Sequence, residues 1–395
     1  MNLMTLVNFE LNPQLNSQFS PQHRPEFEND AQFVDQFGRI KRKLRISVTD
    51  RCNFKCVYCM PEHPEWIKKQ DLLSFEELYT FCDFMVRRGI ESIRITGGEP
   101  LMRQGLVHFV AQLQALKKLG LKRISMTTNA HYLKQYAHAL KQAGLDDLNI
   151  SLDSLNADQF RQLTKKDLSP VLDGIRAAQA VGFPIKINCV LINGMNDDQI
   201  LPLARWSVQE KMSVRFIEFM PLDGDRKWSS EHVVSEQQIL DTLATEFAVT
   251  KHAMTHQAND SLHSHSSHLA SAHTSSDPAR HYFIDGHPIG IISTITHSFC
   301  GTCDRIRLTA QGEFYNCLFA PKCLDLKTEI KALTTSQTFS DVSLYRILSA
   351  YIWNKEAGFH AIQQRLNNPN MDKKSMDKKS MDKKSRKISM HMLGG

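Results

Sequence analysis

No stretch of the sequence is apolar for the roughly 18 residues that a membrane-spanning helix requires. The first residues are polar and lack the apolar centre of a secretion signal. We therefore expect a cytoplasmic protein that has no membrane partner. The sequence also contains no G-x4-G-K-[S/T] motif, so a phosphate-binding loop of that type is excluded.

A strong excess of one charge is likewise missing. The 48 lysines and arginines only slightly exceed the 42 aspartates and glutamates, and the net charge of +6 permits an anionic ligand without indicating nucleic acid. A disulfide framework is not expected either, because the nine cysteines are an odd number and six of them lie in two closely spaced groups. In a reducing compartment such groups indicate metal ligands.

The 395 residues are 42% hydrophobic, which is enough for one large or two ordinary domains. Short β-branched runs alternate with stretches of helical periodicity. The expected strands are residues 44–48, 92–96, 123–127, 148–152, 185–191 and 214–219, and the expected helices are residues 75–88, 105–119, 132–143, 170–181 and 197–209, with Ser74 and Asp197 as N-caps. This alternation requires a parallel sheet, either doubly wound or rolled into a barrel. We expect an α/β fold with an incomplete (β/α)6 TIM-type barrel, whose chemistry lies at the carboxyl ends of the strands.

Composition divides the chain into five segments. We expect a mobile tail at residues 1–38, the barrel at 39–250, a His-rich low-complexity insertion at 251–283, a smaller C-terminal domain at 284–370, and three MDKKS repeats with a Gly-Gly tail at 371–395. The histidines of the insertion are interpreted as a weak, opportunistic chelator, and the repeats as a tether. Cys82 and Cys189 fall in an expected helix and strand, where we assign them to packing.

Cys52, Cys56 and Cys59 form a C-x3-C-x2-C motif directly after the first expected strand. Three closely spaced thiolates suit three irons of a cubane cluster and leave one iron open to an external ligand. Structural zinc is the alternative, but it requires a fourth protein ligand, and His63 is the one nearby candidate in the sequence. Zinc would also leave the aromatic Tyr58, beside the ligands, without explanation.

Cys300, Cys303 and Cys317 form a second group of three. A zinc ribbon remains an alternative here, because Cys323 or His297 could complete a tetrahedral site. Two arginines, Arg305 and Arg307, follow at alternate positions of one expected strand. Their side chains should therefore face the same side.

The first motif with its Tyr58, together with RITGGEP at residues 94–100, resembles the radical S-adenosylmethionine (SAM) superfamily. The resemblance implies that the open iron of a first [4Fe-4S] cluster binds the amino and carboxylate groups of SAM. Gly97 and Gly98 lie at a strand end, where glycines let the backbone approach a ligand closely. Glu99, which follows them, can accept a hydrogen bond from an ammonium group.

With the second motif, CGTCDRIRLTAQGEFYNCLF at residues 300–319, the chain resembles the GTP 3′,8-cyclase family over residues 43–317 and at its Gly-Gly end. The resemblance implies a second [4Fe-4S] cluster on Cys300, Cys303 and Cys317, whose open iron binds the guanine of GTP. It implies Tyr58, Gly98, Ser151 and Met220 as SAM contacts, and Arg45, Arg94, Thr127, Lys186, Arg305 and Arg307 as GTP contacts. A triphosphate carries roughly four negative charges, which suits such a set of cations. Arg305, Arg307, Gly394 and Gly395 would be the catalytic residues, the glycines entering the active site from the tail.

The activity that the resemblance implies is radical cyclisation of GTP to (8S)-3′,8-cyclo-7,8-dihydroguanosine 5′-triphosphate, the first step of molybdenum cofactor biosynthesis. It also implies an electron donor such as flavodoxin and transfer of the product to cyclic pyranopterin monophosphate synthase, and we expect a monomer or a homodimer. Two alternatives remain. A radical peptide-maturation enzyme usually has more auxiliary cysteines, and a non-catalytic iron-sulfur or zinc protein has no need of Gly97 and Gly98 or of the paired arginines.

Overall fold

The computed structural model of the chain describes residues 32–222, 228–251, 277–335, 341–367 and 390–393. Most of the expected tail and of the His-rich insertion, the MDKKS repeats, Gly394 and Gly395 lie outside the described residues. In these ranges no helix is both long and apolar enough to cross a membrane.

Six parallel strands form the centre of the fold, and each matches a run expected from the sequence. They are β1 (Lys43–Ser47), β2 (Ser92–Thr96), β3 (Arg123–Thr128), β4 (Asp147–Ser151), β5 (Ile185–Leu191) and β6 (Ser213–Glu218). Successive side chains of a strand point to opposite faces. In β1, Leu44 and Ile46 belong to the hydrophobic core, whereas Arg45 between them lines a cavity inside the barrel. One face of the sheet therefore holds the helices and the other carries polar groups.

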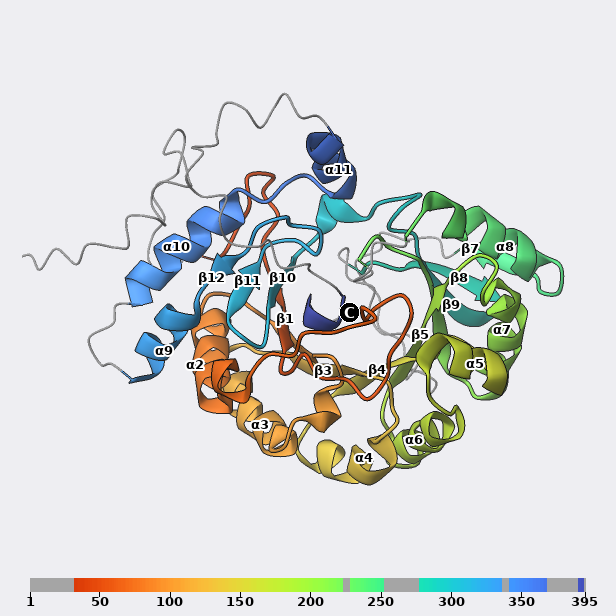
Figure 1. The fold of residues 1–395 in the computed structure, drawn as a ribbon, viewed down its shortest axis with the longest axis horizontal. Helices are drawn as coiled ribbons and strands as arrows, with labels where there is room; N and C mark the ends of the chain where they lie inside the picture. The colour runs from red at the N-terminus through yellow and green to blue at the C-terminus, as the bar shows by residue number, and fades with distance from the viewer. Residues whose placement is uncertain (1–31, 223–227, 252–276, 336–340, 368–389, 394–395) are drawn as a thin grey trace, which may run out of the picture.

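The helices surround the outer side of this curved sheet (Figure 1). They are α2 (Phe75–Val86), α3 (Leu106–Leu113), α4 (Leu133–Gln142), α5 (Ala157–Thr164), α6 (Ser169–Ala180), α7 (Ile200–Gln209) and α8 (Glu236–Ala244). Helix α3 continues into the 3-10 helix η3 (Gln114–Leu119), and η4 (Asp197–Gln199) leads into α7. Cys82 on α2 and Cys189 on β5 are fully buried in the core, so their assignment to packing is confirmed.

Strands from the C-terminal third of the chain extend both edges of the same sheet. Strand β9 (His287–Ile292) pairs parallel with β6 and is followed by antiparallel β8 (Arg280–Ile284) and β7 (Val249–Lys251). At the other edge, β10 (Arg305–Leu308) pairs parallel with β1 and is followed by β11 (Glu313–Tyr315) and β12 (Leu324–Asp325). Over the described residues the sheet runs from β12 to β7 without closing. The incomplete barrel is confirmed, and the C-terminal segment adds to its sheet instead of forming one of its own.

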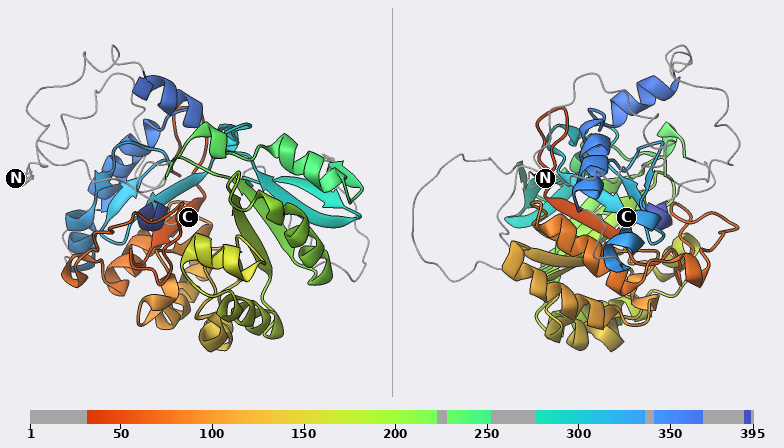
Figure 2. Two further views of the ribbon diagram at one scale, coloured as in Figure 1. Left: turned by 45° about the vertical axis from the view of Figure 1, so that its right-hand side comes forward. Right: turned by 90° about the vertical axis from the view of Figure 1, so that its left-hand side faces the viewer.

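Three further helices, α9 (Lys327–Thr335), α10 (Asp341–Trp353) and α11 (Phe359–Asn367), follow β12. They gather on the side of the molecule that carries α2 and β10–β12, as Figures 1 and 2 show. The short helix α12 (Met390–Leu393) lies apart from them, in the middle of the view in Figure 1. Residues 390–393 are thereby placed beside the inner face of the barrel.

The expected N-terminal tail extends too far. Residues 33–41 are packed against the C-terminal part of the chain: Val34 bridges Ile40, and the buried Phe33 ring lies 5.4 Å from that of Tyr345, centroid to centroid. The charged Asp35, Arg39 and Lys41 are buried here because they form ion pairs with one another, which replace contacts with water.

Two local predictions about helix starts have different outcomes. Ser74 caps α2 and forms a capping box with Glu77, as expected. Asp197 is not an N-cap; its carboxylate accepts a hydrogen bond from Gly194 N (2.8 Å) and closes the preceding turn. The sequence analysis also missed α5, and it assigned residues 280–283 of β8 to the insertion.

Candidate active site

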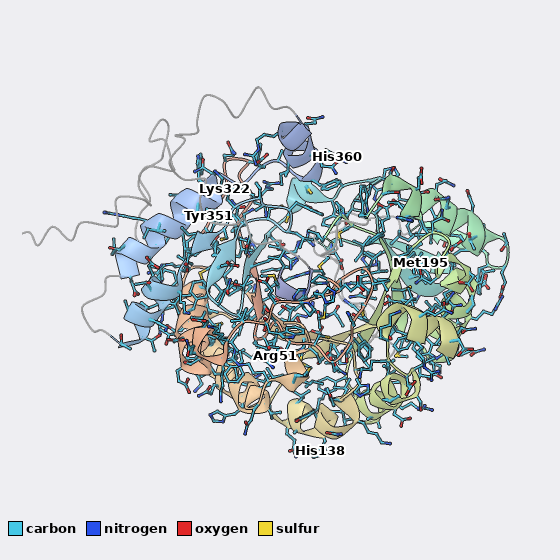
Figure 3. All side chains as sticks on the ribbon, in the orientation of Figure 1. Arg51, His138, Met195, Lys322, Tyr351 and His360 are labelled. Atoms are coloured by element: carbon cyan, nitrogen blue, oxygen red, sulfur yellow. The ribbon has the colours of Figure 1, made fainter. Side chains whose placement is uncertain are left out.

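The first cysteine group lies in the loop after β1, at the carboxyl ends of the parallel strands. Two backbone hydrogen bonds, both 3.0 Å long, tie this loop to the C-terminal end of α5. Arg51, which precedes Cys52, lies toward the middle of the view in Figure 3, whereas His138 on α4 lies at the rim. The unpredicted helix α5 thus supports the loop that carries Cys52, Cys56 and Cys59.

Gly98 has a clear steric requirement. Its N–H donates to Thr49 O (2.7 Å), and a Cβ at this position would lie 2.3 Å from Arg51 O. Any larger residue would push the end of β2 away from the cysteine loop. The close backbone approach that the sequence predicted is therefore, in this structure, an approach to the cysteine loop itself.

Glu99 is fully buried, and protein groups already use both of its oxygens. Oε1 accepts from Leu101 N (3.0 Å) and from the Thr128 hydroxyl (2.8 Å), and Oε2 accepts from Asn129 N (2.8 Å). Burial raises the pKa of this carboxyl to about 7. Glu99 thus joins the ends of β2 and β3, which places Asn129 next to Cys52, 3.8 Å from Nδ2 to Sγ.

Asp153 is a site residue that the sequence analysis missed. Its Oδ2 accepts a 2.6 Å hydrogen bond from the Tyr58 hydroxyl, and its Oδ1 accepts from Val190 N (2.9 Å). Burial raises the pKa of Asp153 to about 6. The contact fixes Tyr58, and with it the cysteine loop, to the ends of β4 and β5. An acidic residue two positions after the end of β4 was the available signal.

A first cavity brings together the residues expected around SAM. It is lined by Cys52, Cys56, Cys59, Tyr58, Gly98, Ser151 and Met220, among others. Thr127, expected as a GTP contact, also lines this first cavity and not the one beside the second cysteine group. Its buried hydroxyl has no hydrogen-bond partner among the residues that the structure describes. A polar group of that kind suits a polar ligand.

A second cavity contains the other cysteine group. It is lined by Cys300, Cys303 and Cys317 together with Arg45, Arg94, Arg305, Arg307 and Lys355. Three of these arginines lie side by side in one row, because Arg307 on β10 is in register with Arg45 on β1, which is in register with Arg94 on β2. We call Arg307, Arg45 and Arg94 the arginine row.

The arginine row concentrates positive charge inside the barrel. Burial lowers the pKa of Arg45, and the neighbouring charges of Arg307 and Arg94 lower it further. Burial likewise lowers the pKa of Arg94 and of Arg307, each to about 10. Buried like charges repel one another, and a bound anion offsets this repulsion. The cavity is therefore suited to a multiply charged anion.

The thiols of the second group differ among themselves. Burial raises the pKa of Cys303, but the positive charges of Arg305 and Lys355 outweigh it and bring the pKa to about 5. Burial raises the pKa of Cys317. Cys303 is therefore prepared as a thiolate, which is the form that binds metals.

The candidates from the sequence do not supply the fourth ligand that a zinc ribbon would require. Neither Cys323 nor His297 lines the second cavity, and the His297 ring instead pairs with Glu236 (3.1 Å). In the part of the chain that the structure describes, no three His, Cys, Asp or Glu side chains are gathered for a single metal ion. Cubane ligands each bind a different iron, so three cysteines around an open cavity suit a cubane.

The two cavities share a wall. Asn188, Ile217, Met220 and Met390 line both of them. Lys186 lines neither; it lies on a separate basic cavity of about 870 Å³ that Arg45, Arg94 and Arg305 also reach. Burial, followed by the charges of Arg215 and Arg123, lowers the pKa of Lys186 to about 8. The structure thus connects Lys186 to the other expected GTP contacts through these shared arginines.

Helix α12 lies at this shared wall. The Arg307 guanidinium donates to Leu393 O (3.2 Å), and Met390 N donates to Leu222 O (3.1 Å). The His391 ring meets the Trp66 ring edge-on, with centroids 6.1 Å apart. Gly394 and Gly395, which follow, lie outside the described residues.

Two family models match successive parts of the chain. Residues 46–207 match the family described as the Radical SAM superfamily, and residues 250–361 match Molybdenum Cofactor Synthesis C. Among solved structures, SuiB of Streptococcus suis bound to its precursor peptide SuiA covers 81% of this chain and 67% of its own, with a TM-score of 0.53 and 14% identity. At that identity the likeness concerns the fold alone.

Full-length relatives are considerably more similar in sequence. A GTP 3′,8-cyclase of Streptomyces coelicolor is 40% identical over 331 residues, which is 82% of this chain and 90% of the relative. A GTP 3′,8-cyclase of Geobacter sulfurreducens is 40% identical over 301 residues, covering 75% of this chain and 86% of the relative. Both cysteine motifs lie within the two matched domains, the first in residues 46–207 and the second in residues 250–361. The chain belongs to the GTP 3′,8-cyclase family of radical SAM enzymes.

Proposed function

We propose that this protein cyclises GTP to (8S)-3′,8-cyclo-7,8-dihydroguanosine 5′-triphosphate, the first step of molybdenum cofactor biosynthesis. The observation that carries the proposal is the shared wall between the two cysteine-lined cavities, formed by Asn188, Ile217, Met220 and Met390. A reactive species made in one cavity would meet a substrate held in the other without crossing solvent. The relatives named GTP 3′,8-cyclase support the same activity.

The first cavity is the proposed place for SAM. Cys52, Cys56 and Cys59 would hold a [4Fe-4S] cluster, which with SAM supplies the radical that removes hydrogen from C3′ of the ribose. Tyr58, Gly98, Ser151 and Met220 line the same space and would position SAM. The hydrogen bond from Tyr58 to Asp153 would keep Tyr58 in place at this side of the first cavity.

The second cavity is the proposed place for GTP. Cys300, Cys303 and Cys317 would hold a second [4Fe-4S] cluster, whose open iron would bind the guanine of GTP. Arg305 and the arginine row would neutralise the triphosphate, with Lys186 at its far end and Thr127 facing the reacting side. The cations are buried before GTP binds, so little reorganisation is needed at the moment of reaction.

Further partners follow from this activity. An electron donor such as flavodoxin would reduce the first cluster, and cyclic pyranopterin monophosphate synthase would take the product. Gly394 and Gly395 would reach the active site from α12, because Arg307 already holds the carbonyl of Leu393. Glycines lack side chains and pass where Cβ atoms would clash.

The test is anaerobic incubation of the reconstituted chain with SAM, dithionite and one purine nucleoside triphosphate at a time. We expect both 5′-deoxyadenosine and a cyclised product with GTP, and little product with ATP, ITP or XTP. Formation of 5′-deoxyadenosine without any cyclised nucleotide would contradict the proposal. A chain in which Cys82 is replaced by Ala is the matched control, since that thiol is buried on α2 away from both cavities.

A further inference from the structure

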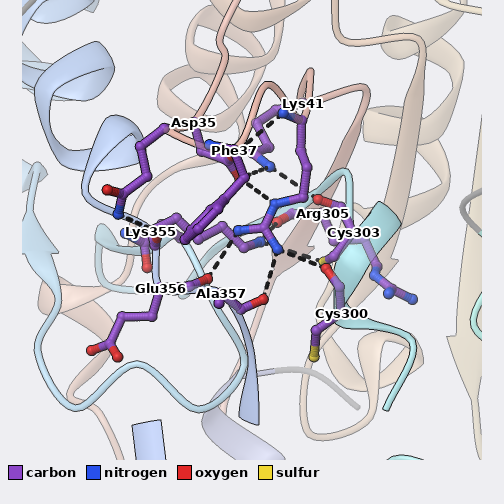
Figure 4. Close-up of polar contacts among 12 residues, drawn as sticks. Asp35, Phe37, Lys41, Cys300, Cys303, Arg305, Lys355, Glu356 and Ala357 are labelled. Carbon is purple, nitrogen blue, oxygen red and sulfur yellow. Dashed lines mark hydrogen bonds and ion pairs between the residues drawn. The ribbon is translucent and has the colours of Figure 1, made fainter. Parts of the chain in front are cut away.

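Lys355 is a buried lysine that touches a cysteine of the second group. It follows α10, and its side chain is shielded from solvent. Its ammonium donates a 3.4 Å hydrogen bond to the Sγ of Cys303 and a 3.0 Å hydrogen bond to the carbonyl of Arg305. The ammonium of Lys355 thus contacts both the Cys303 sulfur and the first residue of β10 (Figure 4).

A polar network fixes the surroundings of this contact. The ammonium of Lys41 pairs with Asp35 (2.5 Å) and donates to the carbonyl of Cys303 (2.9 Å). The guanidinium of Arg39 also pairs with Asp35 (2.7 Å) and donates to the carbonyl of Cys300 (2.6 Å). Figure 4 shows these contacts beside the backbone that carries Cys300 and Cys303. We call residues 35–41 the N-terminal clasp.

The clasp also holds the loop that carries Lys355. Arg39 donates to the carbonyls of Glu356 (2.9 Å) and Ala357 (2.8 Å), and the side-chain amide of Gln36 donates to the carbonyl of Lys355 (3.1 Å). The backbone on both sides of the Lys355 to Cys303 contact is therefore fixed. The contact has little freedom to open when a cofactor binds.

The cations around Cys303 differ in the anionic group that each one faces. Arg39, Lys41 and Lys355 are cations, and Asp35 is the carboxylate that pairs with the first two. The ammonium of Lys355 points to sulfur instead, so its natural anion is the Cys303 thiolate. Hydrogen bonds and positive charge at a ligating sulfur stabilise the state of a cluster that carries one more electron, especially where solvent is excluded.

We infer that Lys355 is a positioning residue that holds the Cys303 thiolate and, through its fixed charge, raises the reduction potential of the cluster on Cys300, Cys303 and Cys317. The inference rests on the proposed function, because it requires the second [4Fe-4S] cluster. It concerns the electronic state of the iron that would hold the guanine, and not the contacts to the triphosphate. The N-terminal clasp acts indirectly, by keeping Lys355 in place.

The experiment is a potentiometric titration of the full-length, anaerobically reconstituted chain, followed by electron paramagnetic resonance. A chain carrying C52A, C56A and C59A identifies the signal of the second cluster. In K355M we expect the ratio of reduced to oxidised second cluster, at the wild-type midpoint potential, to fall about tenfold, which is about 59 mV for a one-electron couple. K355R retains the charge, so its midpoint should return close to the wild-type value.

K41M is the matched control, because Lys41 is equally buried in the same network but contacts the carbonyl of Cys303 instead of its sulfur. Its shift should be clearly smaller than that of K355M. An unchanged potential in K355M, with the second cluster fully present, would overturn the inference and leave the proposed function intact. A wild-type chain that binds only about four irons would instead overturn the proposed function. If K355M loses the second cluster, its retention in K355R supports the inference and its loss in both variants contradicts it.

Discussion

The two cysteine groups are built in opposite ways. The first lies on one loop, near the buried carboxyls of Glu99 and Asp153. Burial and then the charge of Glu99 raise the pKa of Cys52 to about 12. The second is surrounded by Arg305, Lys355 and the N-terminal clasp, and the pKa of Cys303 is about 5. A cubane core is cationic and supplies its own positive charge at the first site. At the second site the protein supplies positive charge before any iron arrives, which suits the anionic nucleotide that we propose for this site.

The largest effect that separates the two sites is expected from removing each group of cysteines. C52A/C56A/C59A should abolish formation of 5′-deoxyadenosine, because the proposed radical source is lost. C300A/C303A/C317A should retain much of the SAM cleavage and lose cyclisation. Iron and sulfide should each fall from about eight to about four per chain in either variant. Equal loss of 5′-deoxyadenosine in both would remove the division of labour between the sites.

Deleting Gly394 and Gly395 is expected to reduce formation of the cyclised product more than cluster assembly, GTP binding or cleavage of SAM. Both clusters and GTP affinity should remain nearly unchanged, since α12 keeps its contacts with Arg307 and Trp66. Removing one MDKKS copy should cost little, because effective concentration changes slowly with tether length once the gap is spanned. The measurement is cyclised product per 5′-deoxyadenosine. A wild-type ratio in the truncated chain would show that the two glycines do not act at the site.

Thiol alkylation of the iron-free chain sharpens the contrast in charge. With its pKa lowered to about 5, Cys303 should react at a nearly constant rate between about pH 6 and pH 8 and more slowly below about pH 5. Cys52, with its pKa raised to about 12, should react about tenfold faster for each pH unit across the same range. Iodoacetamide labelling followed by peptide mass spectrometry measures both in one sample. Parallel pH profiles would show that the two sites do not differ in thiolate content.

The smallest effect is expected from the arginine row. R307A should weaken GTP binding by about 1.5 to 3 kcal/mol, the range for a hydrogen bond to a charged group, which is about 10- to 150-fold in Kd. R205A is the control, because Arg205 pairs with Glu246 on the surface. Calorimetry on chains with both clusters intact gives the comparison. Equal affinity in R307A and wild type would exclude Arg307 from the nucleotide site.

Much of the barrel was predictable from sequence, because its strands are apolar on the face that meets the helices and lie in the expected order. Residues 33–41 were not predictable, since Asp35 and Lys41 read as solvent-exposed until the chain brings Cys303 beside them. The cysteines and arginines were found by motif. The sequence could not show that Thr127 lines the first cavity while Arg45 and Arg94 line the second, because both cavities open from neighbouring strands of one sheet.

The N-terminal clasp also sets the order in which the protein matures. The first cysteine loop and the strand ends and helix that support it lie within residues 43–199, so it can take shape while the ribosome is still making the C-terminal third. The second group needs residues 35–41, 300–317 and 355–357 together, and contacts so distant in sequence form late. For the two clusters proposed above, the first site would thus be complete in a nascent chain and the second only in a finished one.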